Sequence, residues 1–200
     1  MPADASDDSL TDEMAAEQAL VDRARKGDQE AFRALVERYE DMVAATVTGM
    51  LGAGPEADDV GQRVFITFYK KLDQYRGDGG VAPYLNRIAV NTALNALKKQ
   101  KRRTQQMISR DQEEHTPLPD PDSRASMQTF SLKEITEEAL QTLSPKHRSV
   151  VVLRLIQGYS TRETAEILDV PDGTVLSRLH RARKQLQTLL APHVDTHAYR

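Results

Sequence analysis

The sequence predicts an all-α protein of two small helical domains joined by a flexible linker. Apolar residues recur at spacings of three and four along most of the chain, whereas the alternating pattern of strands is scarce. Residues 104–132 interrupt this pattern with acidic residues, serines and the prolines Pro117, Pro119 and Pro121, which is the composition of a linker. A long loop inside one domain is the alternative, but structureless loops longer than about 15 residues are uncommon in compact domains.

Composition excludes several classes of protein. The chain of 200 residues has no cysteine, which excludes a disulfide framework and a cysteine-based zinc site. No apolar run approaches the roughly 20 residues of a membrane span. The N-terminus has neither the basic nor the apolar part of a secretory signal. We therefore expect a cytoplasmic protein.

Charge is distributed unevenly behind a net value of −3. The only charged residues among positions 1–22 are acidic, whereas residues 98–103 read Lys-Lys-Gln-Lys-Arg-Arg. We expect residues 1–18 to form a disordered acidic tail, with a binding element as the alternative. The basic block, and not the whole-chain charge, indicates a polyanionic partner.

The first domain, residues 19–103, is expected to contain four helices. A short helix from Ala19 ends before Gly27, and Asp28 caps a longer one that follows. After a turn at 52–55, a third helix runs from 57 to about 72. A glycine-rich loop at 77–80 precedes the fourth helix, expected from 84 to about 103.

The fourth helix carries a polar flank beside its apolar stripe. Arg87, Asn91, Asn95 and Lys98 lie within an arc of about 80° on a helical wheel. Asparagine is a mediocre helix former, but its amide can hydrogen-bond base edges while cations hold phosphates. Solvated or locally bonded asparagines are the alternative, and the basic block directly after them favours nucleic acid. Tyr84 either stacks on an unpaired base or packs in the core, and the sequence favours neither.

The second domain, residues 133–192, is expected to hold a helix-turn-helix, followed by a tail at 193–200. Ser160 and Glu163 have the spacing of a capping box at the start of a short helix. That helix breaks at Asp169-Val170-Pro171, and a second one opens at Asp172. Such a unit places its second helix in the major groove of DNA.

The second helix of this unit segregates its side chains. Its apolar face is formed by Val175, Leu179, Ala182, Leu186 and Leu189. The opposite side carries Thr174, Ser177, His180, Arg181 and Lys184, with Arg178 and Arg183 on the flanks. No acidic residue occurs from 173 to 190, which suits a phosphate-lined groove, and Arg, Ser and Thr can also contact base edges. An ordinary amphipathic helix with a solvated basic face is the alternative.

Together these segments resemble a known family. Residues 20–32, Tyr75-Arg76-Gly77-Asp78 and residues 84–95 resemble region 2 of a sigma-70-family factor. Residues 143–145 and 173–183 resemble region 4. The match covers about 19–103 and 135–191, and only these two regions are present. This is the arrangement of the extracytoplasmic-function (ECF) group, close to its envelope-stress type.

The resemblance implies a transcription initiation factor that directs core RNA polymerase to promoters. Region 2 would bind the clamp helices of the largest subunit and would melt and read the −10 element. Region 4 would bind the −35 element and dock on the flap of the second-largest subunit. The group usually has an anti-sigma factor, which can hold the sigma factor at the inner membrane of a bacterium.

Site residues follow from the resemblance and from the two patterned helices. For −10 DNA we expect Arg76, Gly77, Asp78, Tyr84, Arg87, Asn91, Asn95, Lys98 and Lys99. For −35 DNA we expect Thr174, Leu176, Ser177, Arg178, His180, Arg181 and Lys184. For core polymerase we expect Asp58, Asp59, Gln62 and Phe65. No catalytic residue, metal or cofactor is expected.

Three positions depart from the family pattern. Arg63 stands where the family often has an acidic residue, which affects docking on the clamp. Tyr84 stands where tryptophan is usual. Leu176 replaces a common Lys or Arg, and an apolar side chain there suits contact with a thymine methyl group.

Other classes of function are less well supported. Asp58 and Asp59 are adjacent, so on a helix they point about 100° apart and make a poor acid/base pair. His193 and His197 have metal-ligand spacing, but the sequence offers no third ligand near them. The stronger alternative is a helix-turn-helix transcriptional regulator that acts independently of core polymerase. Against it, the first domain lacks the alternating strands and helices of a receiver domain.

Overall fold

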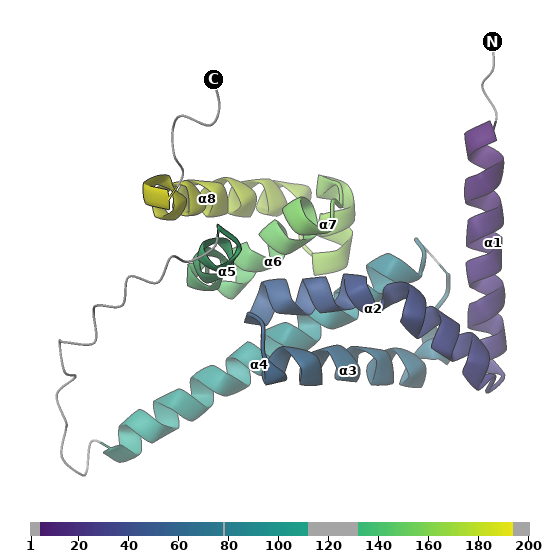
Figure 1. Ribbon diagram of the computed structural model, residues 1–200, viewed down its shortest axis with the longest axis horizontal. Coiled ribbons are helices and arrows are strands. Elements are labelled where there is room, and N and C mark those ends of the chain that lie inside the picture. Colours follow the sequence, from purple (N-terminus) through teal and green to yellow (C-terminus); the bar gives the residue numbers. More distant parts are fainter. Residues whose placement is uncertain (1–4, 78, 112–131, 194–200) are drawn as a thin grey trace.

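The computed structural model describes residues 5–77, 79–111 and 132–193, and these ranges contain helices but no strand (Figure 1). The all-α prediction is confirmed. The first domain consists of α1 (Ala5–Arg25), α2 (Gln29–Leu51), α3 (Pro55–Lys70), the single turn η1 (Leu72–Gln74) and α4 (Val81–Asp111). The second consists of α5 (Leu132–Thr142), α6 (Pro145–Val151), the π-helical turn η2 (Val152–Ile156), α7 (Thr161–Leu168), α8 (Asp172–Leu190) and η3 (Ala191–His193). No helix in the described ranges is long and apolar enough to cross a membrane.

Local sequence signals set several helix ends. The Asp28 carboxylate accepts hydrogen bonds from the backbone N–H groups of Glu30 and Ala31, so the predicted cap of α2 is confirmed. Pro55 occupies the first turn of α3, where its missing N–H costs nothing. Gly52, at a φ of +84°, ends α2 in a backbone conformation that suits glycine.

The structure corrects two expectations about disorder. Helix α1 begins at Ala5, so the expected disordered tail over 1–18 is wrong from that residue onward. Tertiary contacts hold the later part of this helix, where Glu17 accepts hydrogen bonds from Tyr39 Oη and from the Val81 N–H. Helix α4 continues to Asp111, so the expected linker does not begin at 104. Lysine, arginine and glutamine are good helix formers and carry the helix onward, while residues 112–131 of that linker lie outside the described part.

The core of the first domain lies between α1, α2, α3 and α4. Its largest fully buried side chains include Phe68, Leu35, Met50 and Leu85. Burying a side chain of this size stabilises the fold by about 1.5–3 kcal/mol before the entropy cost. These contacts fix α4, and with it the predicted polar flank, against the other three helices.

The second domain has a small core of its own, formed where α5, α6 and α7 meet α8. Val150, Val175, Leu179 and Ala182 lie at its centre. Its remaining apolar surface packs against the first domain. The two domains are therefore not independent bodies in this structure.

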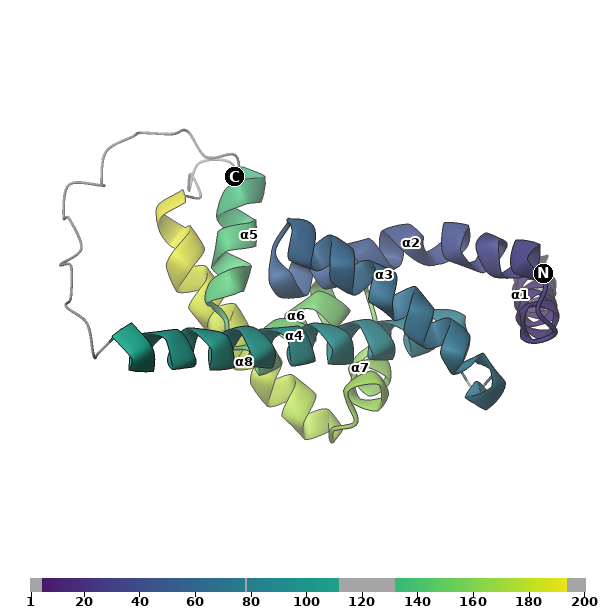
Figure 2. The same cartoon turned by 90° about the horizontal axis from the view of Figure 1, so that it is seen from below.

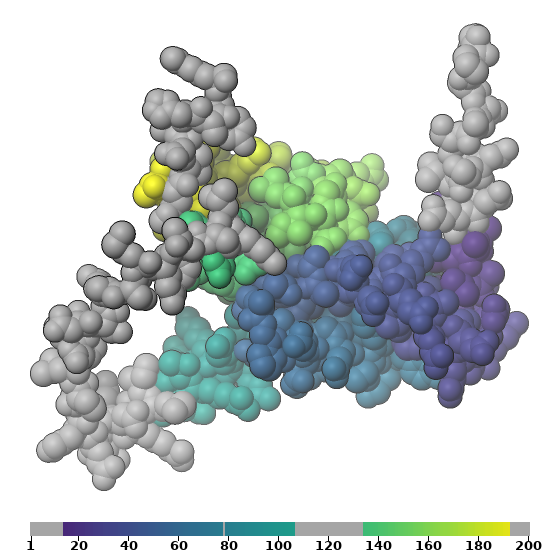
Figure 3. All heavy atoms as spheres, viewed as in Figure 1, coloured from purple at the N-terminus to yellow at the C-terminus, as the bar shows by residue number. Residues whose placement is uncertain are grey.

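Contact between the domains is close along α2 and α4. Val152, Leu153 and Ile167 are buried within the core of the first domain. At Gly49 of α2 an added Cβ would lie 2.9 Å from Val152 Cγ2, so glycine permits this approach. Figure 2 shows α6 and α7 next to α4, and Figure 3 shows atoms of the two domains in contact along α2.

Polar side chains also cross this contact. The Asn86 side chain is fully buried; its amide donates to Tyr159 Oη at 2.9 Å and its carbonyl accepts from Thr46 Oγ1. Gln157 donates to the Met42 carbonyl at 3.2 Å. Buried polar groups of this kind are costly when unpaired, so the network specifies one arrangement of the two domains. Burial raises the pKa of Tyr159, which keeps its phenol neutral as a hydrogen-bonding group.

Candidate nucleic-acid and polymerase interfaces

A glycine-rich loop joins η1 to the start of α4, where the −10 contacts are predicted. Gly77, Gly79 and Gly80 have φ values of +84°, +80° and +86°, a region that other residues rarely adopt. Arg76 is exposed at the start of this loop. Asp78, another expected −10 residue, lies outside the described residues.

The polar flank of α4 is exposed as the pattern predicted. Arg87, Asn91, Asn95, Lys98 and Lys99 all have exposed side chains. The chain has no acidic residue from 79 to 110, so this surface is polar and basic over its whole length. Its geometry suits a nucleic-acid backbone, with amides available to base edges.

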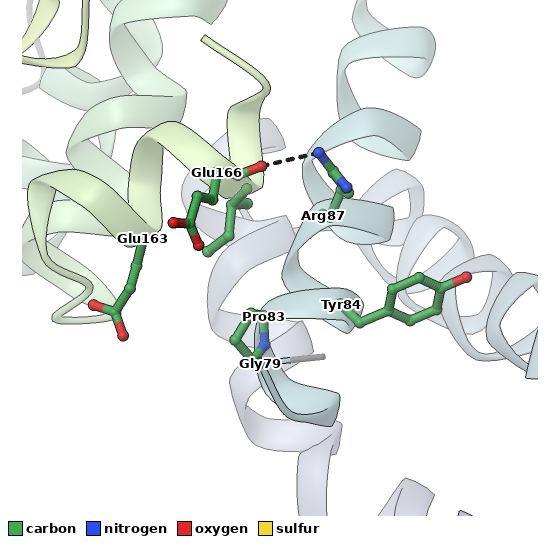
Figure 4. A pocket seen from close by; sticks show the side chains of 7 residues that line it. Gly79, Pro83, Tyr84, Arg87, Glu163 and Glu166 are labelled. Atoms are coloured by element: carbon green, nitrogen blue, oxygen red, sulfur yellow. Dashed lines mark hydrogen bonds between the residues drawn. The ribbon is translucent and has the colours of Figure 1, made fainter. Parts of the chain in front are cut away.

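Tyr84 packs at the edge of an aromatic cluster. Its ring centroid lies 5.1 Å from that of Tyr75 and 6.0 Å from that of Phe68. The side chain is half-buried, and Figure 4 shows its ring directed away from Glu163 and Glu166. The core placement is the one that the structure shows, whereas stacking on a base stays a prediction.

A cavity of about 240 Å³ separates the start of α4 from α7. Its lining comes from both domains: Gly79, Pro83, Tyr84, Arg87, Glu163, Glu166 and Ile167. Arg87 donates a hydrogen bond to the backbone carbonyl of Glu166 at 2.9 Å (Figure 4). Two carboxylates from α7 thus stand beside the predicted −10 surface, where they would repel a phosphate. In this arrangement the second domain covers part of that surface.

The helix-turn-helix has the predicted local geometry. Ser160 Oγ accepts from the Glu163 N–H at 3.2 Å, and Glu163 Oε2 accepts from the Ser160 N–H at 2.7 Å, which confirms the capping box. The hydrogen bonds from the Ser160 side chain and backbone lower the pKa of Glu163. Asp169 ends α7 in the left-handed region, at a φ of +53°, and α8 begins at Asp172.

Helix α8 separates a buried face from an exposed polar one. Val175, Leu179 and Ala182 are buried and Leu186 is half-buried. Leu189 is exposed, so the expected apolar face is wrong at its last position, where the helix runs past the domain core. Of the predicted −35 residues, Leu176, Ser177, His180, Arg181 and Lys184 are exposed and Thr174 and Arg178 are half-buried.

His147 in α6 is a residue of this surface that sequence analysis missed. Partial burial lowers its pKa, and the positive charges of Arg181 and Arg178 lower it further. The imidazole therefore stays neutral beside the basic face near neutral pH. No motif marks His147, because its place follows only from the packing of α6 against α8.

The predicted polymerase-binding residues lie along α3. Asp58, Asp59 and Gln62 are exposed, whereas Phe65 is half-buried against the core. Arg63 Nη2 lies 3.4 Å from Asp59 Oδ2, so this departure from the family pattern forms an exposed ion pair.

Two apolar side chains on the same face of α3 were missed. Ile66 is 52% exposed and Tyr69 is 48% exposed. They follow Gln62 at i+4 and i+7, so all three share one side of the helix. The spacing can be found in the sequence. However, an apolar residue near other apolar residues of a helix is expected to be buried, and only the structure shows that these two are exposed.

Two helical domains, an exposed polar-basic flank on α4 and a helix-turn-helix in the second domain define a DNA-binding protein of the sigma-factor class. Residues 35–103 match the family described as Sigma-70 region 2, and residues 133–186 match Sigma-70 region 4. The chain belongs to the sigma-70 family, within the ECF group of RNA polymerase sigma factors.

Curated relatives cover nearly the whole chain. The ECF RNA polymerase sigma-E factor of Haemophilus influenzae is 36% identical over 186 residues, which is 90% of this chain and 98% of the relative. The protein with the same description in Escherichia coli strain K12 is 37% identical over 186 residues, covering 90% and 97%. The chain is accordingly a transcription initiation factor that works with core RNA polymerase, and the alternative of a regulator independent of core is set aside.

Two solved structures share the fold at lower identity. CnrH, in complex with the cytosolic domain of CnrY, has a TM-score of 0.63 at 24% identity and covers 90% of this chain and 99% of its own. The sigma factor RpoE of Bartonella quintana, in complex with the anti-sigma factor NepR, has a TM-score of 0.63 at 23% identity and covers 80% and 96%. Both agree with the all-α arrangement described above.

Proposed function

We propose that α4 and α8 divide promoter recognition between them, with α4 contacting the −10 element and α8 contacting the −35 element. One observation carries this division of labour. Each helix presents an exposed polar-basic surface on a stretch without a carboxylate, residues 81–106 in α4 and residues 173–190 in α8. The other side of each helix is fixed in a core, so the two surfaces are held in defined orientations.

At the −10 element, Asn91 is proposed to hydrogen-bond an unpaired base. It lies one helical turn from Arg87 and one turn from Asn95, and all three side chains are exposed. Lys98 and Lys99 continue the surface and would hold the phosphates on either side. The loop at 77–83 would form the wall of the base site.

At the −35 element, Arg181 and Ser177 are proposed to contact base edges in the major groove. Both side chains are exposed near the middle of the polar face of α8. Leu176, which is 54% exposed, would contact a thymine methyl group. Arg178, His180 and Lys184 would complete the contacts to bases and phosphates.

The exposed side of α3 is proposed to dock on the clamp helices of the largest polymerase subunit. Asp58, Asp59 and Gln62 supply its polar part, and Ile66 and Tyr69 supply apolar area. An apolar centre with a polar rim is the usual composition of a protein–protein interface. Phe65 would contribute through the small part of its ring that the core leaves free.

Two further contacts complete the proposal. The second domain would dock on the flap of the second-largest subunit, and an anti-sigma factor would hold the protein inactive, at the inner membrane where that factor is membrane-bound. Both follow from the properties of the ECF group. Core polymerase is proposed to separate the domains, because in the packed arrangement α7 occupies Arg87 and places Glu163 and Glu166 beside the −10 surface.

The test of the −10 assignment is transcription by reconstituted holoenzyme from a promoter mapped on a genomic library. We expect Asn91→Ala to leave binding to core intact but to impair open-complex formation and to lose preference among −10 variants, even on a pre-melted template. Gln100→Ala is the matched control, since Gln100 is an exposed amide on the other side of α4. Unchanged selectivity in Asn91→Ala would reduce Asn91 to a structural residue.

A further inference from the structure

Glu17 in α1 connects three helices through its carboxylate. Oε1 accepts a hydrogen bond from the Val81 backbone N–H at 3.0 Å, and Oε2 accepts one from Tyr39 Oη. Tyr39 belongs to α2 and Val81 is the first residue of α4. The contact with Val81 spans 64 positions in the sequence, so no local motif predicts it.

The start of α4 needs such an acceptor. The first N–H groups of a helix have no partner within the helix, and a carboxylate is favourable at that end of the helix dipole. The first turn of α4 has no acidic residue of its own. Glu17 therefore supplies from α1 the capping charge that the sequence around Val81 lacks.

The same helix also restrains the loop that leads into α4. Arg25 donates to the carbonyls of Leu72 and Tyr75, which come before the loop. Within the loop, an added Cβ at Gly77 would lie 3.1 Å from Gln18 Oε1. Helix α1 thus contacts the loop before, within and after its glycines, and Figure 1 shows α1 standing beside it. Glycines lose more conformational freedom than other residues when they become ordered. The contacts with α1 help to offset that cost.

We propose that Glu17 is a positioning residue for −10 recognition: it orders Gly79, Gly80 and the first turn of α4, so that the base site is formed before DNA arrives. This inference rests on the proposed role of that loop and of Asn91. Glu17 itself touches no DNA in this account. Its effect passes through the Val81 N–H and through Tyr39.

The experiment compares three holoenzymes with the wild type: Glu17→Ala, Glu17→Gln and the control Glu40→Ala, which removes an exposed carboxylate from α2. Hydrogen exchange in the full-length protein should show faster exchange at the amides of residues 79–82 in Glu17→Ala only. Glutamine keeps an acceptor for Val81 and can donate to Tyr39 Oη, so it should exchange as the wild type does. Hydrogen exchange is measured without DNA, so its result does not depend on the proposed −10 contacts.

Transcription then measures the consequence. Glu17→Ala should slow open-complex formation about tenfold, the effect of one hydrogen bond to a charged acceptor, and should weaken −10 selectivity on a pre-melted template. Affinity for core polymerase and −35 discrimination should stay at wild-type values. Glu17→Gln should stay within about twofold of the wild type, because glutamine keeps both hydrogen bonds and loses only the smaller contribution of the charge at the helix end.

The outcomes separate this inference from the proposed function. Wild-type selectivity in Glu17→Ala, alongside lost selectivity in Asn91→Ala, would overturn the role of Glu17 alone. A defect in Glu17→Gln as large as that in Glu17→Ala would overturn the hydrogen-bonding account. Wild-type selectivity in both Asn91→Ala and Glu17→Ala would overturn the proposed −10 site, and the inference with it.

Discussion

Individual side chains of α8 are either exposed on the face proposed to contact DNA or buried in the domain core. On α8 the division is sharp, because Val175, Leu179 and Ala182 are buried while Ser177 and Arg181 are exposed. A substitution on the exposed side changes recognition without opening a cavity, whereas one on the buried side unfolds the domain. Recognition mutants can therefore be chosen here without loss of the fold.

Arg181→Ala is expected to cost about 1–3 kcal/mol of discrimination between the −35 element and random duplex, because a bidentate arginine contact to a base has that value. The measurement is competition binding by holoenzyme at fixed salt. Arg183→Ala, on the flank of the same helix, is the comparison and should weaken both duplexes alike. Equal losses in Arg181→Ala would show that Arg181 contacts only phosphate.

At the scale of elements, the sequence predicted those helix ends that are set by contacts between neighbouring residues. The Asp28 cap, the Ser160–Glu163 box and the break at Asp169 are all formed by residues within four positions of one another, and all are present. The packing of Glu17, the burial of Asn86 and the position of His147 depend on partners far away in sequence. Glu17 meets Val81 across 64 positions and Asn86 meets Tyr159 across 73, so only the folded chain reveals them.

Helix α6 carries a pH-sensitive group against α8. The pKa of His147 is lowered in the folded protein by burial and by Arg181 and Arg178, so the unfolded chain binds more protons. Stability is then full above the ordinary histidine pKa of about 6.5 and falls as pH drops from there toward the lower folded-state value.

The expected result is a smaller loss of thermal stability between about pH 7.5 and 5.5 in His147→Gln than in the wild type, since glutamine carries no proton in this range. Thermal unfolding followed by circular dichroism measures it. The other histidines are the same in both proteins, so the difference isolates His147. Identical pH dependence in the two proteins would contradict the assignment.

At the scale of the whole molecule, the second domain packs against the Arg87 end of the surface proposed to contact the −10 element. Arg87 is bonded to Glu166, and Asn86 and Gln157 tie α4 and α2 to the second domain. A ligand can separate the two domains only to the extent that it binds the separated form more tightly than the packed form. We propose that core polymerase has that property because it contacts both domains at a fixed distance. Promoter DNA alone offers each domain only a few phosphate contacts, and binding of that kind is weak at physiological salt.

The most direct test of this account is a gel-shift titration on one mapped promoter, with and without core polymerase, at two lengths of the spacer between the −35 and −10 elements. We expect weak, salt-sensitive binding by the free protein at both spacer lengths. With core we expect tight binding that depends on the spacer, because the two recognition helices are then held at a set separation. Tight, sequence-specific binding without core would contradict this account.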